Sequence, residues 1–494
     1  MNTMHIDVAI IGAGTAGLSA RAEVAKVTDS YRVFDPGPLG TTCARTGCMP
    51  SKAFVQSAHD YHRRAAFAAL GLEGAKDVRA NGASVLARTR GLRDDFSAGA
   101  VAGMEKWSDT HLVRHAAAFT QDGTIRAGDQ VFQPHAPVIA TGTRPVVPDG
   151  WHGMLGDRLL TTETCFDMAK LPRRVGVIGL GPVGLELGQA MARLGVEVTG
   201  FDPSATFGGI SDPALQACLE ASIGREMRIV QATADPSLAT DGSVTLTWDG
   251  GEITVDHVLV AMGRVPNTPS LKLGRIGLTM RDDGHPALPS GQLNISGTSI
   301  YFAGDVSVGP ALLHEAADEG RVAGFYAARK QDATFSRRVP LGMVFTDPQI
   351  ASVGATLDDL EKDDADVAIG SSSFASAGRT RLARGSGGMI VIYADKATAR
   401  LRGAAIIAPK AEHIAHLLAF AICSHADLKD LLRMPYYHPA HEEVLRQALR
   451  ATLAVCAVDS EPLEQTRCRD TPVDASTRTK PQQTPKDKTY AIDT

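Results

Sequence analysis

Hydrophobic residues along this chain repeat one arrangement twice. The first copy begins at Asp7 as DVAIIGAGTAGLSARAEV, in which a short β-branched apolar run leads into spaced glycines and then an alanine-rich stretch. The second copy begins at Arg174 as RVGVIGLGPVGLELGQAMARLG and keeps the same order. An apolar run bounded by glycines predicts a buried parallel strand, and the stretch after it predicts a helix. The pattern therefore predicts an α/β fold that contains two strand, turn and helix units.

The glycines of the first copy have the spacing Gly-x-Gly-x-x-Gly. Gly12 permits the tight turn, Gly14 lets backbone amides approach a pyrophosphate, and Gly17 lets the helix pack on the strand. Asp35 ends the next apolar run, YRVFD, where a carboxylate binds a ribose hydroxyl. A lone glycine pattern is weak evidence, but here the strand, the turn, the helix and the acid reinforce one another. We therefore predict a Rossmann-like dinucleotide-binding domain.

The second copy predicts a second Rossmann-like domain. Gly179, Gly181 and Gly184 take the same places in its turn, and Asp202 closes the strand that follows. An acid at this strand end favours the free 2′-hydroxyl of NAD, whereas the 2′-phosphate of NADP would need a nearby arginine. The sequence FDPSATFGG has no arginine, so we predict NAD rather than NADP at the second site.

Two of the seven cysteines lie close together. Cys43 and Cys48 stand in PLGTTCARTGCMPSKAF, a glycine-containing turn that opens onto a helical run and is followed by Lys52. A helix N-terminus and a nearby cation lower the pKa of a thiol, so this pair can cycle between dithiol and disulfide. Two plain buried thiols are one alternative. Half of a zinc site is another, although the sequence offers no matching second pair of ligands.

These motifs, in this order, resemble the flavoprotein family that contains dihydrolipoamide dehydrogenase, glutathione reductase and mercuric reductase. The resemblance implies FAD in the first site and NAD in the second, with electrons passing between nicotinamide, flavin, a Cys43–Cys48 disulfide and a substrate. It makes Cys48 the thiolate against the flavin and Cys43 the exchanging sulfur. Lys52 is expected beside the flavin, paired with Glu186, which follows the second glycine turn.

The resemblance assigns further cofactor positions. VIATGTRPVVP places a Thr-Gly pair after a strand at the link between the two domains, and HVLVAMGRVPNT repeats that device. IYFAGDVSVGP ends a strand at a Gly-Asp pair, where the family holds the ribityl chain of FAD; an ordinary strand-end turn is the alternative. The expected FAD positions are Gly12, Gly14, Gly17, Asp35, Thr42, Lys52, Thr141, Gly142, Gly304 and Asp305, and the expected NAD positions are Gly179, Gly181, Gly184, Asp202 and Gly263.

The family's domain order predicts boundaries along the chain. Residues 1–150 and 272–338 are expected to form the FAD domain, residues 151–271 the NAD domain, and residues 339–455 an α+β dimerisation domain that implies a homodimer. Residues 456–494 are rich in threonine, proline, aspartate and lysine, so we predict a disordered tail. Cys456 and Cys468 belong to this tail, and we interpret them as incidental rather than as a second redox pair.

The sequence MPYYHPAHEEVLR places Glu443 five residues after His438. The pKa of imidazole lies near neutrality, which suits thiol exchange, and a carboxylate can fix its tautomer. A solvated histidine at a helix start is the alternative. The spacing resembles a family element that reaches the cysteine pair of the other subunit. Ala440 replaces the usual threonine, and His441 is a rival base that we expect on the surface. Mercuric reductases have tyrosine in place of His438 and a terminal cysteine pair, which argues against mercury.

Composition excludes other classes of function. The formal net charge of −5 gives no electrostatic case for nucleic acid or for an anionic membrane surface. No apolar run reaches the ~20 residues that span a bilayer, and the first residues do not have the pattern of a signal peptide. We therefore expect a cytoplasmic protein without a membrane or nucleic-acid partner, and we assign no metal site.

Within the family, the predicted NAD preference, Glu186 and His438 favour an enzyme like dihydrolipoamide dehydrogenase. Such an enzyme oxidises a small dithiol or a lipoyl carrier domain and passes the electrons through FAD to NAD. The nearest alternative is an NAD(P)H-dependent reductase of another disulfide or of a small oxidant. An alternative from another class is a non-catalytic flavin-binding subunit, although packing alone does not require Cys43, Cys48 and His438 together.

Overall fold

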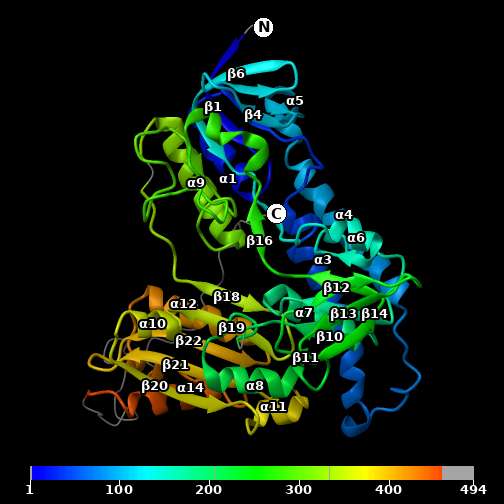
Figure 1. The fold of residues 1–494 in the computed structure, drawn as a ribbon. Helices are drawn as coiled ribbons and strands as arrows, with labels where there is room; N and C mark the ends of the chain where they lie inside the picture. The colour runs from blue at the N-terminus through cyan, green and yellow to red at the C-terminus, as the bar shows by residue number, and fades with distance from the viewer. Residues whose placement is uncertain (1–2, 205, 333, 386, 459–494) are drawn as a thin grey trace, which may run out of the picture.

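The chain folds into three units, and a later segment returns to the first of them. The computed structural model describes residues 3–458 other than 205, 333 and 386 (Figure 1). The first two units contain mainly parallel sheets between helices, and the third is an antiparallel sheet with helices. This confirms the predicted fold class of two Rossmann-like domains and a C-terminal α+β domain.

The first unit is built around β1, which lies between β2 and β6 in a sheet of order β3-β2-β1-β6-β5-β4. Val8 and Ile10 are fully buried because helices cover the parallel sheet. Strand β17 pairs with β6 and so returns a late segment to this sheet. The elements are β1 Thr3–Ile11, α1 Thr15–Val24, β2 Tyr31–Phe34, α2 Thr42–Arg45, α3 Cys48–Arg63, α4 Gly82–Ala102, α5 Glu105–His111, β3 Leu112–Val113, β4 Ala117–Phe119, β5 Ile125–Ala127, β6 Gln130–Ile139, β17 Tyr301–Phe302 and α9 Leu313–Arg329.

The second unit repeats the parallel design in a sheet of order β11-β10-β9-β15-β8, beside a small antiparallel sheet β12-β13-β14. Two antiparallel linker strands, β7 and β16, join it to the first unit. The linkers lie side by side because the chain crosses once in each direction. The elements are β7 Thr143–Pro145, α6 Trp151–Leu155, β8 Leu159–Leu160, β9 Arg174–Ile178, α7 Pro182–Arg193, β10 Glu197–Phe201, α8 Pro213–Ile223, β11 Arg228–Val230, β12 Asp235–Leu238, β13 Val244–Trp248, β14 Gly251–Val255, β15 His257–Val260 and β16 Arg264–Pro266.

The third unit is an antiparallel sheet of order β18-β19-β22-β21-β20. Its buried face packs on α12 and α14, whose apolar residues form one core with the strands. The elements are β18 Leu341–Val344, β19 Gln349–Gly354, α10 Leu357–Lys362, β20 Val367–Ser373, α11 Gly378–Ala383, β21 Met389–Asp395, β22 Leu401–Ala408, α12 Ala411–Cys423, α13 Leu428–Leu432 and α14 Glu442–Leu453. The Ala457 amide still donates to the Lys396 carbonyl, whereas residues 459–494, with Cys468 and most of the predicted tail, lie outside the described residues.

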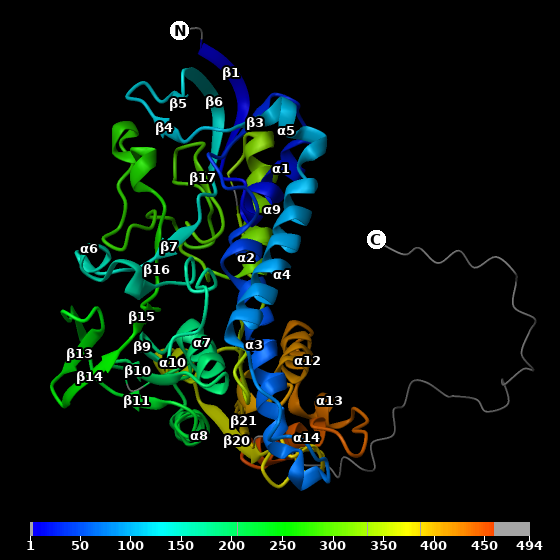
Figure 2. The ribbon, with the colours of Figure 1, turned by 90° about the vertical axis from the view of Figure 1, so that its right-hand side faces the viewer.

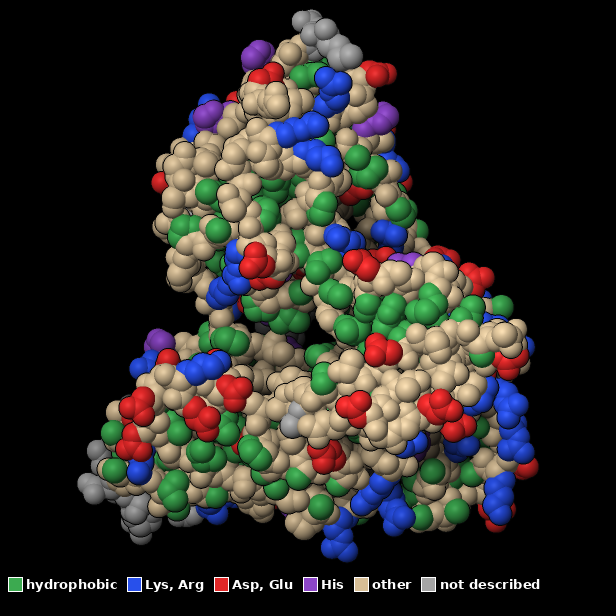
Figure 3. Space-filling model, in the orientation of Figure 1, with side chains coloured by type: hydrophobic (Ala, Val, Ile, Leu, Met, Phe, Trp, Pro, Cys, Tyr) green, Lys and Arg blue, Asp and Glu red, His purple; other side chains and the backbone are tan. Residues whose placement is uncertain are grey.

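Helix α3 brings the three units together. Figure 2 shows α3 and α4 along one side of the molecule, extending from the first unit down to the other two. Phe54 and Val55 of α3 share a core with residues of the second and third units, such as Leu187 and Val344. Seen from the side in Figure 3, the surface is hollowed between the first unit above and the other two below. Helix α3 therefore begins at Cys48 in the first unit, and its later residues also pack against the second and third units.

No helix in the part of the chain that the structure describes is long and apolar enough to cross a membrane.

Candidate redox site

The cysteine pair lies where α2 ends and α3 begins. Cys43 is in α2, and Cys48 is the first residue of α3, directly after Gly47. A side chain at Gly47 would place its Cβ 3.0 Å from the Thr42 carbonyl oxygen, so glycine lets the two short turns approach. Both cysteines are free thiols in this structure, and each side chain shifts the pKa of the other. The structure therefore places the two predicted cysteines close enough to interact.

The two sulfurs have opposite acidities. A hydrogen bond from Cys43 lowers the pKa of Cys48 to about 6, and the nearby Lys52 ammonium lowers it further against the effect of burial. The pKa of Cys43 is raised, first by the hydrogen bond that it donates to Cys48 and then by burial. Cys48 also occupies the first turn of α3, where the helix dipole favours a thiolate. In the dithiol form the proton therefore stays on Cys43 and the charge lies on Cys48.

Lys52 and Glu186 form the predicted ion pair. The Lys52 Nζ lies 2.7 and 3.1 Å from the two carboxylate oxygens of Glu186, which reaches it from α7. Glu186 is 6% exposed and Lys52 is 35% exposed, so the carboxylate is shielded from water while the lysine stays partly exposed. Phe345 contacts both members of this ion pair. Its amide donates a hydrogen bond to Glu186 at 2.8 Å, and the Lys52 Nζ lies 4.7 Å from the centre of its ring. The sequence predicted the pair but not Phe345.

The first glycine turn has the geometry that its sequence predicted. Gly12 has φ +110°, and a Cβ there would lie 2.3 Å from the Ala140 carbonyl oxygen. At Gly17 a Cβ would lie 1.8 Å from the Gly12 carbonyl oxygen, so the helix could not pack on the turn, whereas at Gly14 it would meet open space. The Asp35 carboxylate accepts a hydrogen bond from the Ala13 amide at 2.8 Å and thereby stabilises the turn. The turn is fixed at both ends and open at Gly14.

The second glycine turn repeats this construction. Gly179 has φ +94°, a Cβ at Gly184 would lie 1.9 Å from the Gly179 carbonyl oxygen, and Gly181 faces open space. Asp202 accepts the Leu180 amide at 2.8 Å, as Asp35 does in the first turn. Each carboxylate oxygen keeps a lone pair after one such bond, so both acids remain able to accept a hydroxyl group. Two equivalent cradles are thus present for two dinucleotides.

The predicted positions near the linker strands fit a bound polar molecule. The Thr141 hydroxyl is buried and has no hydrogen-bond partner among the residues that the structure describes. Burial raises the pKa of Asp305. Gly304, the residue before it, packs on the first turn of α1, where a Cβ on Gly304 would lie 2.8 Å from the Ala16 side chain. A buried hydroxyl without a partner among the described residues and a half-buried carboxylate are groups that a cofactor would satisfy. These residues therefore fit FAD.

Thr143 and Arg264 also belong to this region, although the sequence did not single them out. The Thr143 hydroxyl donates to Asp305 at 3.4 Å and accepts from Arg264 at 2.8 Å. The neighbouring predicted positions Gly142 and Gly263 both have positive φ, +64° and +101°. The two strand-then-glycine devices thus meet at the paired strands β7 and β16, and the side chains that follow the two glycines, Thr143 and Arg264, are hydrogen bonded to each other. The remaining predicted position, Thr42, is exposed at the start of α2.

His438 and Glu443 form the expected hydrogen-bonded pair at the start of α14. The His438 Nδ1 lies 3.0 and 3.1 Å from the two Glu443 oxygens, and His438 is 79% exposed. The hydrogen bond from His438 lowers the pKa of Glu443. His441, which was expected on the surface, is partly exposed and also packs against Phe374 and contacts the Thr380 hydroxyl at 3.5 Å.

The structure does not bring the histidine to the cysteines of its own chain. Figure 2 places α2 near the middle of the molecule and α14 toward its lower end. The Cys43–Cys48 pair, the Lys52–Glu186 pair and the two glycine turns therefore form one part of the site, and the exposed His438 forms another.

Two dinucleotide cradles and a contacting thiol pair define a dinucleotide-dependent dithiol–disulfide oxidoreductase. Comparison with known proteins gives the same class, since residues 6–320 match the pyridine nucleotide-disulphide oxidoreductase family and residues 341–449 match the dimerisation domain of that family. The chain belongs to the pyridine nucleotide-disulphide oxidoreductase family. It is an oxidoreductase and a flavoprotein whose cofactors are FAD and NAD, as predicted, and its third unit is the family's dimerisation domain.

Several curated relatives match almost the whole chain. Dihydrolipoyl dehydrogenase of Geobacillus stearothermophilus is 29% identical over 455 residues, which cover 90% of this chain and 95% of that protein. Dihydrolipoyl dehydrogenase 1, mitochondrial, of Arabidopsis thaliana is 30% identical over 464 residues, with 90% of each chain covered. Leghemoglobin reductase of Vigna unguiculata is 28% identical, with 90% of this chain and 87% of that protein covered.

Solved structures share the fold. The HOCl-induced flavoprotein disulfide reductase RclA from Escherichia coli superposes in its Cu(II) complex with a TM-score of 0.78 at 20% identity, covering 91% of this chain and 99% of that one. LpdA from Mycobacterium tuberculosis superposes with a TM-score of 0.76 at 22% identity and the same coverage. These structures therefore support the arrangement of three units.

Proposed function

We propose that this protein oxidises dihydrolipoamide to lipoamide and reduces NAD⁺ to NADH. The substrate loses two electrons and two protons as its sulfurs join; NAD⁺ gains a hydride and one proton is released. The observation that carries the proposal is the Cys43–Cys48 thiol pair at the start of α3, with the pKa of Cys48 lowered and that of Cys43 raised, beside the Lys52–Glu186 pair. The curated relatives named dihydrolipoyl dehydrogenase support the choice of dithiol.

The proposed role of each site residue is the one that the family resemblance implies, and the contacts described above support it. Cys43 exchanges with the sulfurs of the dithiol substrate, and Cys48 carries the negative charge that Lys52 stabilises. FAD, when bound, supplies a two-electron acceptor between the sulfurs and the nicotinamide. The residues proposed to hold FAD are Gly12, Gly14, Gly17, Asp35, Thr42, Lys52, Thr141, Gly142, Gly304 and Asp305, and those proposed to hold NAD are Gly179, Gly181, Gly184, Asp202 and Gly263.

His438 acts on the proton of the exchanging thiol. Glu443 binds Nδ1, which leaves Nε2 available to accept or return a proton. Because His438 is exposed and lies apart from the cysteines of its own chain, we propose that it serves the cysteine pair of the partner subunit in a homodimer. Each active site is then composed of residues from two subunits. One subunit supplies the cysteines from its predicted FAD domain, and the other supplies His438 from its predicted dimerisation domain.

A second candidate function has a specific observation in its favour. The relatives and solved structures include a leghemoglobin reductase and an HOCl-induced flavoprotein disulfide reductase. The same sulfur pair can therefore take electrons from NADH or NADPH and reduce a different disulfide or a small oxidant. A non-catalytic flavin-binding subunit is less well supported, because the sulfurs, the ion pair and the histidine pair all retain a geometry suited to catalysis.

Steady-state assays on one purified preparation separate these functions. We expect fast NAD-linked oxidation of dihydrolipoamide and slow reduction of glutathione disulfide by NADH or NADPH. Slow dihydrolipoamide turnover with fast reduction of another acceptor would move the function to a reductase while keeping the redox pair. Absence of all these activities in FAD-loaded protein would contradict both enzymatic candidates.

A further inference from the structure

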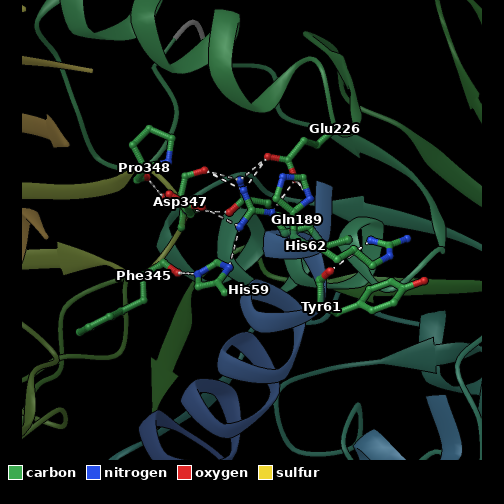
Figure 4. Close-up of polar contacts among 11 residues, drawn as sticks. His59, Tyr61, His62, Gln189, Glu226, Phe345, Asp347 and Pro348 are labelled. Carbon is green, nitrogen blue, oxygen red and sulfur yellow. Dashed lines mark hydrogen bonds and ion pairs between the residues drawn. The ribbon is translucent and has the colours of Figure 1, made fainter. Parts of the chain in front are cut away.

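Below the cysteines, α3 and α7 face each other through polar side chains. Lys52 and His59 lie four and eleven residues after Cys48, which places all three on one side of α3. Helix α7 presents Glu186 and, seven residues later, Arg193 toward them. Figure 4 shows the lower contact, in which His59, Gln189 and Asp347 of the segment after β18 lie close together, and Arg193 bonds to both His59 and Asp347. The helices are therefore joined at two levels, Lys52 with Glu186 and His59 with Arg193.

Arg193 is the charged centre of the lower level. Its side chain is 2% exposed and binds Glu226 at 2.6 and 2.8 Å and Asp347 at 3.0 Å. Gln189 adds bonds in both directions to the backbone of Asp347. A buried guanidinium with its carboxylates in place holds its neighbours firmly, because removing one partner would leave an unpaired charge. The segment after β18 is thus fixed against α7.

His59 has one possible arrangement of its ring proton in this cluster. Its Nδ1 lies 2.7 Å from an Arg193 nitrogen, and its Nε2 lies 3.1 Å from the Phe345 carbonyl oxygen. Because arginine is only a donor, Nδ1 accepts and Nε2 carries the hydrogen that is donated to Phe345. Burial, and then the Arg193 charge, lower the pKa of His59 and keep it neutral.

Phe345 is the residue that joins the two levels. Its carbonyl accepts from His59, while its amide donates to Glu186 at 2.8 Å. Its ring also lies against the Lys52 ammonium. One residue of the third unit is therefore held at its carbonyl by His59 and at its amide by the acid that pairs with Lys52.

We propose that His59 is a positioning residue that acts through Phe345 to fix the Lys52–Glu186 pair beside the Cys48 sulfur. The proposal rests on the redox role of the cysteine pair proposed above and adds the residue that sets its electrostatic surroundings. Loss of the bond from His59 frees Phe345, and its amide then compensates the Glu186 charge less well. A less compensated Glu186 opposes the thiolate form of Cys48.

The test measures the acidity of Cys48 directly in the FAD-loaded protein. In a Cys43→Ser background, the long-wavelength absorbance of a thiolate beside oxidised flavin is titrated against pH. We expect a midpoint near pH 6 in this background, where serine can still donate a hydrogen bond to Cys48. His59→Leu should raise the midpoint by about one pH unit, a tenfold loss of thiolate below the midpoint.

Three further variants define the controls. His59→Gln retains an acceptor and a donor and should shift the midpoint less than His59→Leu. The asparagine side chain of His59→Asn is too short to bond to Phe345, so this variant should give the same upward shift of the midpoint as His59→Leu. It replaces the leucine variant in the test if that protein fails to fold. His62→Ala changes a histidine that lies on the same helix and 4.0 Å from Glu226 without a bond to Phe345, and it should leave the midpoint unchanged.

Each result has a definite meaning. An unchanged midpoint in folded His59→Leu or His59→Asn protein would overturn the positioning role, as would an equal shift in His62→Ala. Absence of the absorbance band in the Cys43→Ser background itself would instead overturn the proposed redox role of Cys48, and the role of His59 with it. The failure of the inference and the failure of the proposed function are therefore distinct outcomes.

Discussion

At the scale of single residues, the site depends on neighbours that are far apart in the sequence. Lys52 and Glu186 are 134 positions apart, and the bond from His59 to Phe345 spans 286 positions. The sequence could predict Cys43, Cys48, Lys52 and Glu186 because each stands in or beside a recognisable motif. It could not predict His59 or Phe345, because their importance arises only where three units meet. A histidine spaced along the Lys52 face of α3 was the one available signal.

His438 provides a test at this scale. Replacing His438 with Gln should slow reduction of the enzyme by dihydrolipoamide about a hundredfold or more, because the substrate thiol loses its base. Flavin reduction by NADH should keep its rate, since that step does not use the substrate thiol. Stopped-flow measurement of both half-reactions checks this, with Glu443→Gln as a milder change that leaves the imidazole present. Equal slowing of both half-reactions would show that His438 is structural.

At the scale of elements, the two glycine turns are the most predictable part of the protein. Each needs a positive φ at its first glycine and a close backbone contact at its last, so the residue type follows from steric requirements alone. The hydrogen bonds from Asp35 and Asp202 to the turn amides were not predicted, because the sequence indicated only a ribose ligand there. The acids therefore hold the turns whether or not they also bind ribose.

The second turn permits a matched pair of substitutions. Gly181→Ala places a methyl group in open space at an extended backbone position, so folding and FAD content should be unchanged. If the backbone amides there approach a pyrophosphate, the methyl group should raise the KM for NAD about tenfold. Gly184→Ala forces a Cβ to 1.9 Å from the Gly179 carbonyl oxygen and should cost about 3 kcal/mol of stability or more. Thermal melts and NAD kinetics distinguish them. A destabilised Gly181→Ala protein with unchanged KM would remove Gly181 from the proposed NAD site.

At the scale of the whole molecule, His438 lies apart from the cysteines of its own chain. The strand order and the return of β17 to the first sheet follow from contacts between distant segments, which hydrophobic periodicity does not encode. The unit types were nevertheless predictable, because each has its own motif at its start. The exposed His438 gives the strongest structural reason to expect that the working unit is a dimer.

Subunit mixing tests that expectation. Cys48→Ser and His438→Gln homodimers should each be nearly inactive in dihydrolipoamide oxidation. If each site takes its cysteines from one subunit and its histidine from the other, a heterodimer of the two variants contains one intact site and should recover about half the wild-type activity. Co-expression with two affinity tags isolates that heterodimer. An inactive heterodimer with both subunits loaded with FAD would place the histidine and the cysteines of one site in the same chain.

The central claim is that Cys43 and Cys48 exchange electrons with NADH through the bound flavin, and thiol trapping tests it most directly. Wild-type protein, as isolated in air, is alkylated under denaturing conditions before and after anaerobic addition of NADH, and the peptide that contains both cysteines is weighed. We predict an unmodified disulfide peptide before NADH and a doubly alkylated peptide after it, with the other cysteines unchanged. A peptide whose state is the same before and after NADH would contradict the redox role of the pair.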